Sequence, residues 1–202
     1  MRKSVKFWML AAIFVLSGAS MVGCKNKTAK QAETEVKTEA PVQSDAQVGD
    51  PINAVDDYLV NEIGKNYSQA ELCIPYSYVV STDESNPDDI LVWGDFWVFN
   101  YDLSGDTLKT VSGGSHPGLM HLKKTDSGYE VTAFDAVADG SEYLPSAKRI
   151  FGDQFGAFQE INSNAEKRED LRRHFTAEYV KNHGLSATLL QDFGWPAVEL
   201  PL

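Results

Sequence analysis

The sequence predicts an α+β domain in which an antiparallel meander of four to five strands is packed by one N-terminal helix and by C-terminal helices. Apolar residues first recur at helical spacing, then alternate as in strands through the middle of the chain, and then return to helical spacing. With 202 residues, 43% of them hydrophobic, the chain is long enough for one such domain and for additional segments. We expect the helices to cover one face of the sheet.

The first predicted helix begins at the dipeptide Asp50-Pro51. An aspartate side chain caps a helix by accepting a bond from a free backbone N–H, and proline fits the first helical position. Gly64 is placed to end this helix. Its apolar residues recur at helical spacing: Ile52, Val55, Leu59 and Ile63.

Alternating apolar residues predict the strands of the middle segment. Ile90 to Leu103 carries apolar residues on both faces, so we expect it to be the central strand. Its aromatic ladder, which includes Trp93 and Trp97, is expected to form core beneath the helices, and the alternative is a concave ligand pocket. The other strands are predicted at 72–80, 107–111, 119–124 and 129–137, joined by turns.

Helical spacing returns in the last third of the chain. Pro145 to Phe158 is predicted to form one helix. A capping box of Ser163 and Glu166 starts a second helix, which we expect to bury Phe175. The remaining segment, 185–202, is expected to form a short helix or turn docked on the domain.

The first 24 residues have the composition of a secretory signal peptide. Three basic residues are followed by an apolar run from Phe7 to Leu16 and then by small, weakly polar residues. This run is too short for a membrane span, which needs about 20 residues. The small segment ends in Met21-Val22-Gly23-Cys24 and resembles the lipobox of bacterial lipoproteins. The alternative is an ordinary secretory signal with a chance cysteine.

The lipobox resemblance implies that residues 1–23 are a signal peptide and that Cys24 receives a diacylglyceryl group and an acyl chain such as palmitate. It places the protein in the cell envelope, anchored through Cys24 to a bacterial membrane, with its domain outside the cytoplasm. Residues 24–49 lack aromatic residues and are rich in polar ones, so we expect a disordered tether. We expect residues 50–202 to form a single α+β domain.

The charge of the chain excludes one class of partner. The net charge is −11, and after removal of residues 1–23 it becomes −14, with 15 Lys and Arg against 29 Asp and Glu. Nucleic-acid binding needs a surplus of Lys and Arg, so we expect no nucleic-acid partner. An acidic surface is also repelled by anionic lipid headgroups, so the lipid has to provide the anchoring.

The middle of the chain contains five short motifs, Gly113-Gly114-Ser115-His116, Leu122-Lys123-Lys124, Ser127-Gly128-Tyr129-Glu130, Asp139-Gly140-Ser141 and Ser146-Ala147-Lys148. Together these motifs resemble small extracytoplasmic modules of gut-type bacteria, which occur as lipoproteins or attached to antirepressor-related sensor peptidases. The resemblance implies no particular activity. The order of a helix followed by a meander is also similar to cystatin-like and NTF2-like folds.

The densest candidate for chemistry is the segment from Gly113 to Gly118. Ser115 and His116 are candidate ligand contacts, but adjacent residues in an extended segment point apart and Pro117 favours extended backbone at His116. We therefore expect a tight turn or bulge here, with His116 exposed at a strand end and neither residue catalytic. Trp93 and Trp97 are weaker candidate contacts.

Metal and cofactor sites are not expected. The four histidines lack ligand spacing, and the acidic run at 83–89 lacks the spacing of a calcium loop. Cys73 lies within a strand and is interpreted as a small buried side chain. The predicted function is therefore a non-catalytic module that binds a protein, peptide or small molecule. The alternatives are an enzyme with a pocket in the curved sheet, and an accessory or sensor partner of an envelope peptidase.

Overall fold

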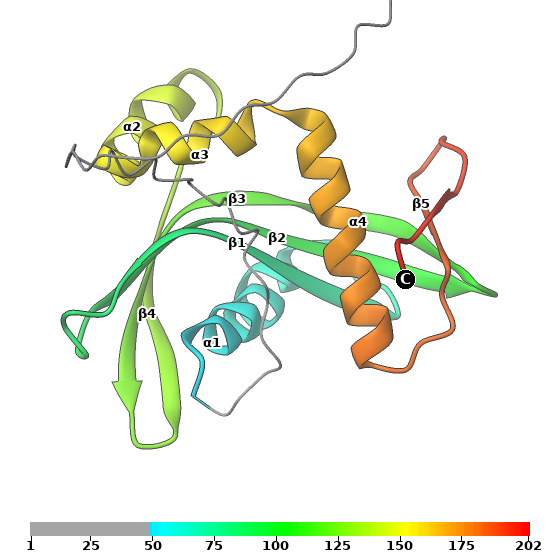
Figure 1. Cartoon of the computed structure of the whole chain (residues 1–202), viewed down its shortest axis with the longest axis horizontal. Helices are drawn as coiled ribbons and strands as arrows, with labels where there is room; N and C mark the ends of the chain where they lie inside the picture. The colour runs from blue at the N-terminus through cyan, green and yellow to red at the C-terminus, as the bar shows by residue number, and fades with distance from the viewer. Residues whose placement is uncertain (1–48) are drawn as a thin grey trace, which may run out of the picture. The chain divides into compact units, whose positions relative to one another are not determined.

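A long antiparallel meander forms the centre of the computed structural model, which describes residues 49–202 (Figure 1). Each of the first three strands pairs antiparallel with the next one along the chain. The sheet order is β1-β2-β3-β5-β6, and β4 also pairs with β3. The α+β fold class predicted from the sequence is confirmed. The strands are β1 (Leu72–Asp83), β2 (Ile90–Ser104), β3 (Thr107–Thr125), β4 (Gly128–Ala136), β5 (Leu189–Gln191) and β6 (Val198–Glu199).

The first helix of the described chain, α1 (Pro51–Tyr58), begins where the sequence predicts it. The Asp50 side chain accepts a hydrogen bond from the backbone N–H of Ile52 at 2.9 Å. A π-helical turn (Leu59–Ile63) and a 3-10 turn (Gly64–Asn66) extend α1. The predicted signal peptide, the lipidated Cys24 and the tether up to residue 48 lie outside the described residues.

The glycine-rich segment 113–118 is part of β3, so the prediction of a turn there is wrong. Each of its residues pairs with a residue of β2, and a β-bulge at Val111 precedes it. Glycine is required at position 113 because a Cβ atom there would lie 2.4 Å from the Val98 carbonyl oxygen. The glycines in this segment therefore serve close packing and not chain reversal.

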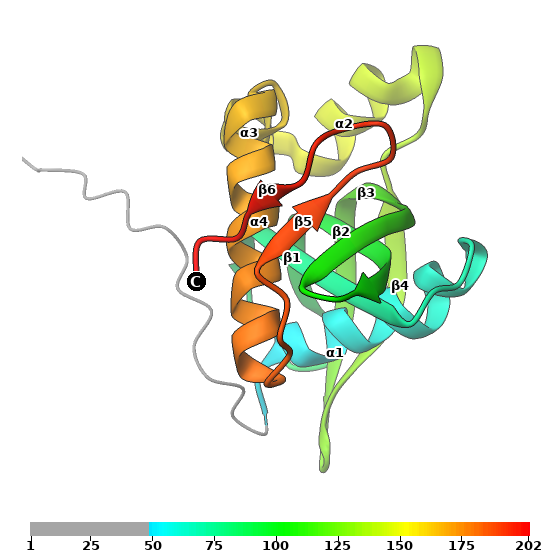
Figure 2. The same cartoon turned by 90° about the vertical axis from the view of Figure 1, so that its right-hand side faces the viewer.

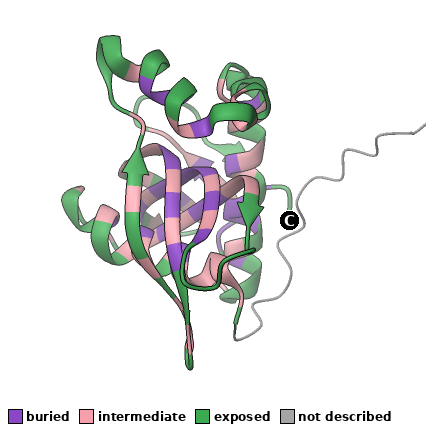
Figure 3. Cartoon of the chain, turned by 90° about the vertical axis from the view of Figure 1, so that its left-hand side faces the viewer, coloured by how far each residue is buried: buried purple, intermediate pink, exposed green. Residues whose placement is uncertain are grey.

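Helices lie on both faces of the sheet, which corrects the prediction that all of them cover one face (Figure 1). Val55 of α1 packs with Phe96 of β2 on one face. On the other face, α4 (Ala165–Asn182) packs over Trp97 and Tyr101. Because β2 carries large apolar side chains on both sides, each face needs a cover of its own. Figure 3 shows the resulting concentration of buried residues in the central strands.

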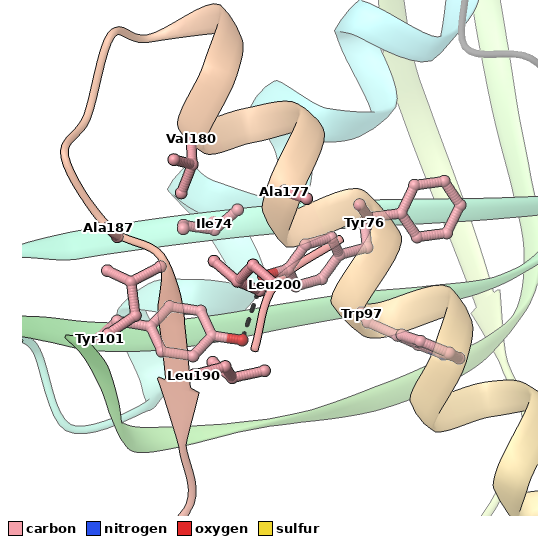
Figure 4. Close-up of a cluster of buried hydrophobic side chains, with 11 residues drawn as sticks. Ile74, Tyr76, Trp97, Tyr101, Ala177, Val180, Ala187, Leu190 and Leu200 are labelled. Atoms are coloured by element: carbon pink, nitrogen blue, oxygen red, sulfur yellow. Dashed lines mark hydrogen bonds between the residues drawn. The ribbon is translucent and has the colours of Figure 1, made fainter. Parts of the chain in front are cut away.

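The core cluster beneath α4 contains a small polar network (Figure 4). The Tyr76 hydroxyl donates to the Tyr101 hydroxyl at 3.0 Å and lies 2.9 Å from the hydroxyl of Thr176. Buried hydroxyl groups need such partners, because an unpaired one costs free energy of folding. Phe175 is buried in the same cluster, as predicted.

The segment predicted as one helix at 145–158 forms two helices, α2 (Tyr143–Phe151) and α3 (Phe155–Asn162). Gly152, with φ +48°, separates them by adopting a conformation that favours glycine. A 3-10 turn precedes α2 (Gly140–Glu142), and another one joins it to α3 (Gly152–Gln154). The rings of Phe151 and Phe158 stack with centroids 4.1 Å apart, so the two helices share one small core.

The N-terminus of α4 is capped one residue later than predicted. The side chain of Asn164 accepts a hydrogen bond from the backbone N–H of Lys167 at 3.0 Å. The hydroxyl of Ser163 instead donates to the carbonyl of Gln159 at 2.7 Å, in the preceding helix. The capping-box prediction therefore located the start of the helix correctly but assigned the cap to the wrong side chain.

Residues 189–199 form a β-hairpin, where a short helix or turn was predicted (Figure 2). Its first strand runs parallel to β3, with Leu189 paired to Thr107. Leu190 and Leu200 are buried in the cluster beneath α4. We call residues 189–199 the C-terminal hairpin.

Candidate functional site

A buried carboxylate, that of Asp95, lies in the middle of the sheet on the face that carries α4. Its residue is only 1% exposed. The Ser115 hydroxyl donates a hydrogen bond to one carboxylate oxygen at 2.5 Å, and Arg168 Nη2 lies 3.4 Å from the other oxygen. We call Asp95, Ser115 and Arg168 the Asp95 cluster.

Strand register and one helix position bring the Asp95 cluster together. Ser115 pairs with Trp97, two residues along β2 from Asp95, so both side chains emerge on the same face. Arg168 comes from the first turns of α4 and places its guanidinium group 5.2 Å from the centre of the Trp97 ring. The guanidinium group thus contacts the aromatic ring and faces the carboxylate at the same time.

A second set of hydrogen bonds connects the Asp95 cluster to the helices around it. The side-chain oxygen of Asn162 accepts bonds from Arg168 at 2.8 Å and from the Tyr143 hydroxyl at 2.9 Å. These residues belong to α3, α4 and α2, respectively. The cluster therefore fixes three helices to one position on the sheet.

The electrostatics of Asp95 reflect a balance of opposing effects. Burial raises the pKa of Asp95, while Arg168 and the Ser115 hydroxyl lower it, and the net shift is upward. The Trp97 indole N–H makes a further, smaller contribution that lowers the pKa of Asp95. Burial raises the pKa of Tyr143, and the negative charge of Asp95 adds to that shift. The Asp95 carboxylate can therefore accept a hydrogen bond from the Ser115 hydroxyl, while the positive charge of Arg168 compensates the negative charge of the carboxylate.

His116 lies on the opposite face of β3 and is half-buried, so the prediction of an exposed histidine at a strand end is wrong. Its Nε2 atom is 2.9 Å from the Tyr67 hydroxyl, and the two rings meet edge to face. Burial lowers the pKa of His116, and the charge of Asp139 opposes that shift. Ser115 and His116 therefore point to different partners, as the sequence predicts.

The two tryptophans predicted as weak ligand contacts are packed beneath helices. Trp97 is buried under Arg168, and its neighbour Trp93 packs with the small core of α2 and α3. The Trp93 indole N–H donates to the Ile150 carbonyl at 2.9 Å. Both side chains thus contribute to the core of the domain.

The remaining candidates make local contacts at the surface. His121 Nδ1 lies 2.8 Å from Asp89, and the Lys123 ammonium group lies 3.4 Å from Asp88, so two aspartates of the acidic loop contact side chains of β3. Cys73 is half-buried, and burial raises the pKa of its thiol. Within residues 49–202, no group of three or more histidine, cysteine or acidic residues is arranged to hold a metal ion.

The sequence reasoning missed two members of the Asp95 cluster, Asp95 and Arg168. A signal for Asp95 was present, because it is a charged residue in phase with Trp93 and Trp97 on an inward face of a strand. Arg168 and Arg172 precede Phe175 at helical spacing, which places both arginines on the buried face of α4. A charged residue at a buried position needs a partner of opposite charge, so the sequence pattern could have indicated an ion pair between β2 and α4.

A second feature lies at the C-terminal hairpin, where large aromatic side chains are exposed. Phe193 is 97% exposed and Trp195 is 72% exposed. Gly194, with φ +79°, separates them at the tip of the hairpin. Aromatic side chains are more often buried or at interfaces, so this degree of exposure calls for an explanation.

Comparisons with family models, with curated proteins and with solved structures found no match. Among the described helices, none combines the length and the apolar character needed to cross a membrane.

Proposed function

We propose that this protein is a membrane-anchored extracytoplasmic module that binds a partner through its folded domain and is not an enzyme. The observation that supports a binding role is the exposure of Phe193 and Trp195 on the C-terminal hairpin. Aromatic anchors of this kind provide much of the free energy in protein interfaces. Exposed apolar surface also favours aggregation, so a role in binding accounts for its presence.

In this proposal the Asp95 cluster holds the domain together. Ser115 and Arg168 each stabilise a different oxygen of the Asp95 carboxylate. His116, the nearest histidine in sequence, is directed to Tyr67 on the opposite face and is not placed to act as a base for Ser115. The hydroxyl and the guanidinium group therefore compensate a buried charge, and the cluster joins α2, α3 and α4 to the sheet.

The membrane anchor is proposed from the N-terminal sequence. Residues 1–24 resemble a lipoprotein signal peptide that ends at Cys24, and the attached lipid provides the membrane affinity. Residues 49–202 carry 11 Lys and Arg against 25 Asp and Glu. This acidic domain is repelled by anionic lipids, so without the lipid it is released.

Replacement of Cys24 by alanine tests the anchor. In a bacterial host we expect Cys24→Ala to move the protein out of the membrane fraction and to abolish incorporation of labelled fatty acid. Cys73→Ala is the matched control, because Cys73 is half-buried within β1 and should leave both properties unchanged. Continued fatty-acid labelling of the Cys24→Ala protein would show that the assignment is wrong.

A further inference from the structure

Exposed apolar residues of the described chain are concentrated near the C-terminal hairpin. Six large hydrophobic residues are exposed in residues 49–202. Five of these six lie on or near the C-terminal hairpin, and one of the five is Val111 on β3. Val111 lies two residues beyond Lys109, the last residue of β3 that pairs with β5. The sixth, Leu144, belongs to α2. The four in the last ten residues are Phe193, Trp195, Val198 and Leu202.

The aromatic tip of the hairpin is held in one geometry by the rest of the domain. Arg172, itself 5% exposed, donates to Asp192 at 3.2 Å at the end of β5. The Trp195 backbone N–H donates to the Asp192 carbonyl at 3.0 Å, and the Gln191 side chain donates to the Trp195 carbonyl at 3.1 Å. A tip fixed in this way loses little conformational entropy on binding, so it is suited to dock into a pocket.

The charge around the hairpin indicates what kind of pocket it fits. Residues 182–202 contain two acidic residues, Asp192 and Glu199, and neither lysine nor arginine, but Asp192 is paired with Arg172 of α4 and Lys109 of β3 pairs with Gln191 of the hairpin. The negative charge near the tip therefore comes mainly from the domain as a whole. Residues 49–202 as a whole carry a net charge of −14. A partner surface with positive charge around an apolar pocket is complementary to both properties, because opposite potentials favour encounter and correct orientation.

We propose that the C-terminal hairpin inserts Phe193 and Trp195 into an apolar pocket on a partner protein whose rim is rich in lysine and arginine. This inference depends on the proposed binding function and adds the surface and the chemistry of the partner. A lipid bilayer fits less well, because aromatic residues that insert into membranes are accompanied by lysine and arginine, which are absent from 182–202. A second copy of the chain would bring two strongly acidic domains together.

Site-specific photo-crosslinking of the full lipidated chain tests the inference. A benzoylphenylalanine residue is introduced in place of Trp195, or in place of Leu144 as the matched exposed apolar control, in cells that produce the protein. We expect irradiation to join the Trp195 position to one partner protein, with a yield about tenfold or more above that of the Leu144 position. Mass spectrometry of the joined peptides should place the contact on an apolar surface flanked by lysine or arginine.

The ionic strength of the same experiment tests the charge argument. In isolated membranes we expect the yield at the Trp195 position to fall several-fold between about 0.05 M and about 0.5 M salt, because salt screens attraction between opposite charges. A yield independent of salt would contradict a lysine- and arginine-rich rim.

Other outcomes separate this inference from the proposed function. Crosslinks from Trp195 to lipid, to another copy of the chain, to residues 24–48, or to a surface without basic residues would overturn the inference. Crosslinks to a partner from Leu144 alone would also overturn it, while the binding function would stand with a different surface. Absence of protein crosslinks from both positions would contradict the binding function itself.

Discussion

At the scale of single residues, the domain contains a half-buried carboxylate, that of Asp56, whose environment differs from that of the buried Asp95. Asp56 of α1 accepts a hydrogen bond from the Ser77 hydroxyl at 2.7 Å, but within residues 49–202 no cation is paired with it as Arg168 is with Asp95. Burial raises the pKa of Asp56 to about 6, and the nearby charges of Asp57 and Asp50 add to the shift, which the Ser77 hydrogen bond partly opposes. Asp56 is therefore a source of instability at neutral pH.

The sign of this effect gives a pH-dependent prediction for Asp56→Asn. The native state holds its Asp56 proton up to a pH of about 6, whereas an unfolded aspartate loses it near 3.8, so this group's contribution to stability falls as pH rises between those values. Asparagine cannot ionise and keeps an oxygen that accepts the Ser77 hydrogen bond. Allowing for partial exposure to solvent, we expect the variant to be about 1–2 kcal/mol more stable than the parent at pH 8 and equal to it at pH 4.

Urea unfolding of both proteins across this pH range measures the difference. Asp126→Asn, in the exposed turn between β3 and β4, is the control and should change stability little at any pH. If Asp56→Asn were less stable than the parent at pH 8, the ionised Asp56 carboxylate would be stabilising the native state and the prediction would be wrong.

At the scale of secondary-structure elements, β3 depends on glycine for its close approach to β2. Gly113 has φ +151°, and an added Cβ would meet the Val98 carbonyl oxygen at 2.4 Å and the Phe99 ring at 2.5 Å. We expect Gly113→Ala to destabilise the domain by about 2–3 kcal/mol, because the clash involves backbone atoms that cannot move freely.

Gly156 of α3 provides the comparison for that prediction. It is exposed, and an added Cβ at this position has no atom within 4 Å. Gly156→Ala should be neutral or stabilising by about 0.5–1 kcal/mol, because alanine favours a helix interior. Thermal unfolding measures the midpoints of the two variants, and we expect a lower midpoint for Gly113→Ala than for Gly156→Ala. Equal midpoints would show that close packing at Gly113 does not stabilise β3.

The elements that the sequence predicts correctly are those with a strong local pattern. The start of α1 after Asp50, the strands β1, β2 and β4, and the burial of Phe175 follow from capping and apolar spacing. The strands predicted separately at 107–111 and 119–124 are parts of one strand, β3. The segment 113–118 was predicted as a turn because glycine and proline often mark turns, but here long-range pairing with β2 determines the conformation. The short β5 strand depends on β3, which is distant in sequence, so its local pattern could not predict it.

In the candidate site, too, features set by local sequence could be predicted, and features set by contacts between distant segments could not. The opposite directions of Ser115 and His116 follow from strand alternation. Their partners do not, because Asp95 and Tyr67 come from other parts of the chain and meet them only through tertiary packing. The exposure of Trp195 could not be predicted either, since the segment around it is apolar and suggests docking on the body of the domain.

At the scale of the whole molecule, the sequence predicts a boundary near residue 50 between a polar segment and the folded domain. The segment 24–48 contains four lysines and four acidic residues and lacks the aromatic residues of a core, whereas the next Lys, Lys65, lies in a 3-10 turn at the end of the first helix. We predict that brief trypsin treatment of the full chain cuts at Lys37 or before it and leaves a resistant fragment that retains residue 202. Mass spectrometry identifies the fragment, and cleavage after Lys65 at the same rate would contradict this division.

The parallel pairing of β5 with β3 has a consequence for newly made chains. Thr188 contacts Asp106, which lies 82 residues earlier, and Leu190 and Leu200 fill space between the sheet and α4. The hairpin therefore has no surface to dock on until the meander and α4 are in place, so its aromatic tip becomes ordered at the end of assembly. A partner that recognises the ordered tip would distinguish mature copies of the protein from unfinished ones, and binding would act as a check on completed folding.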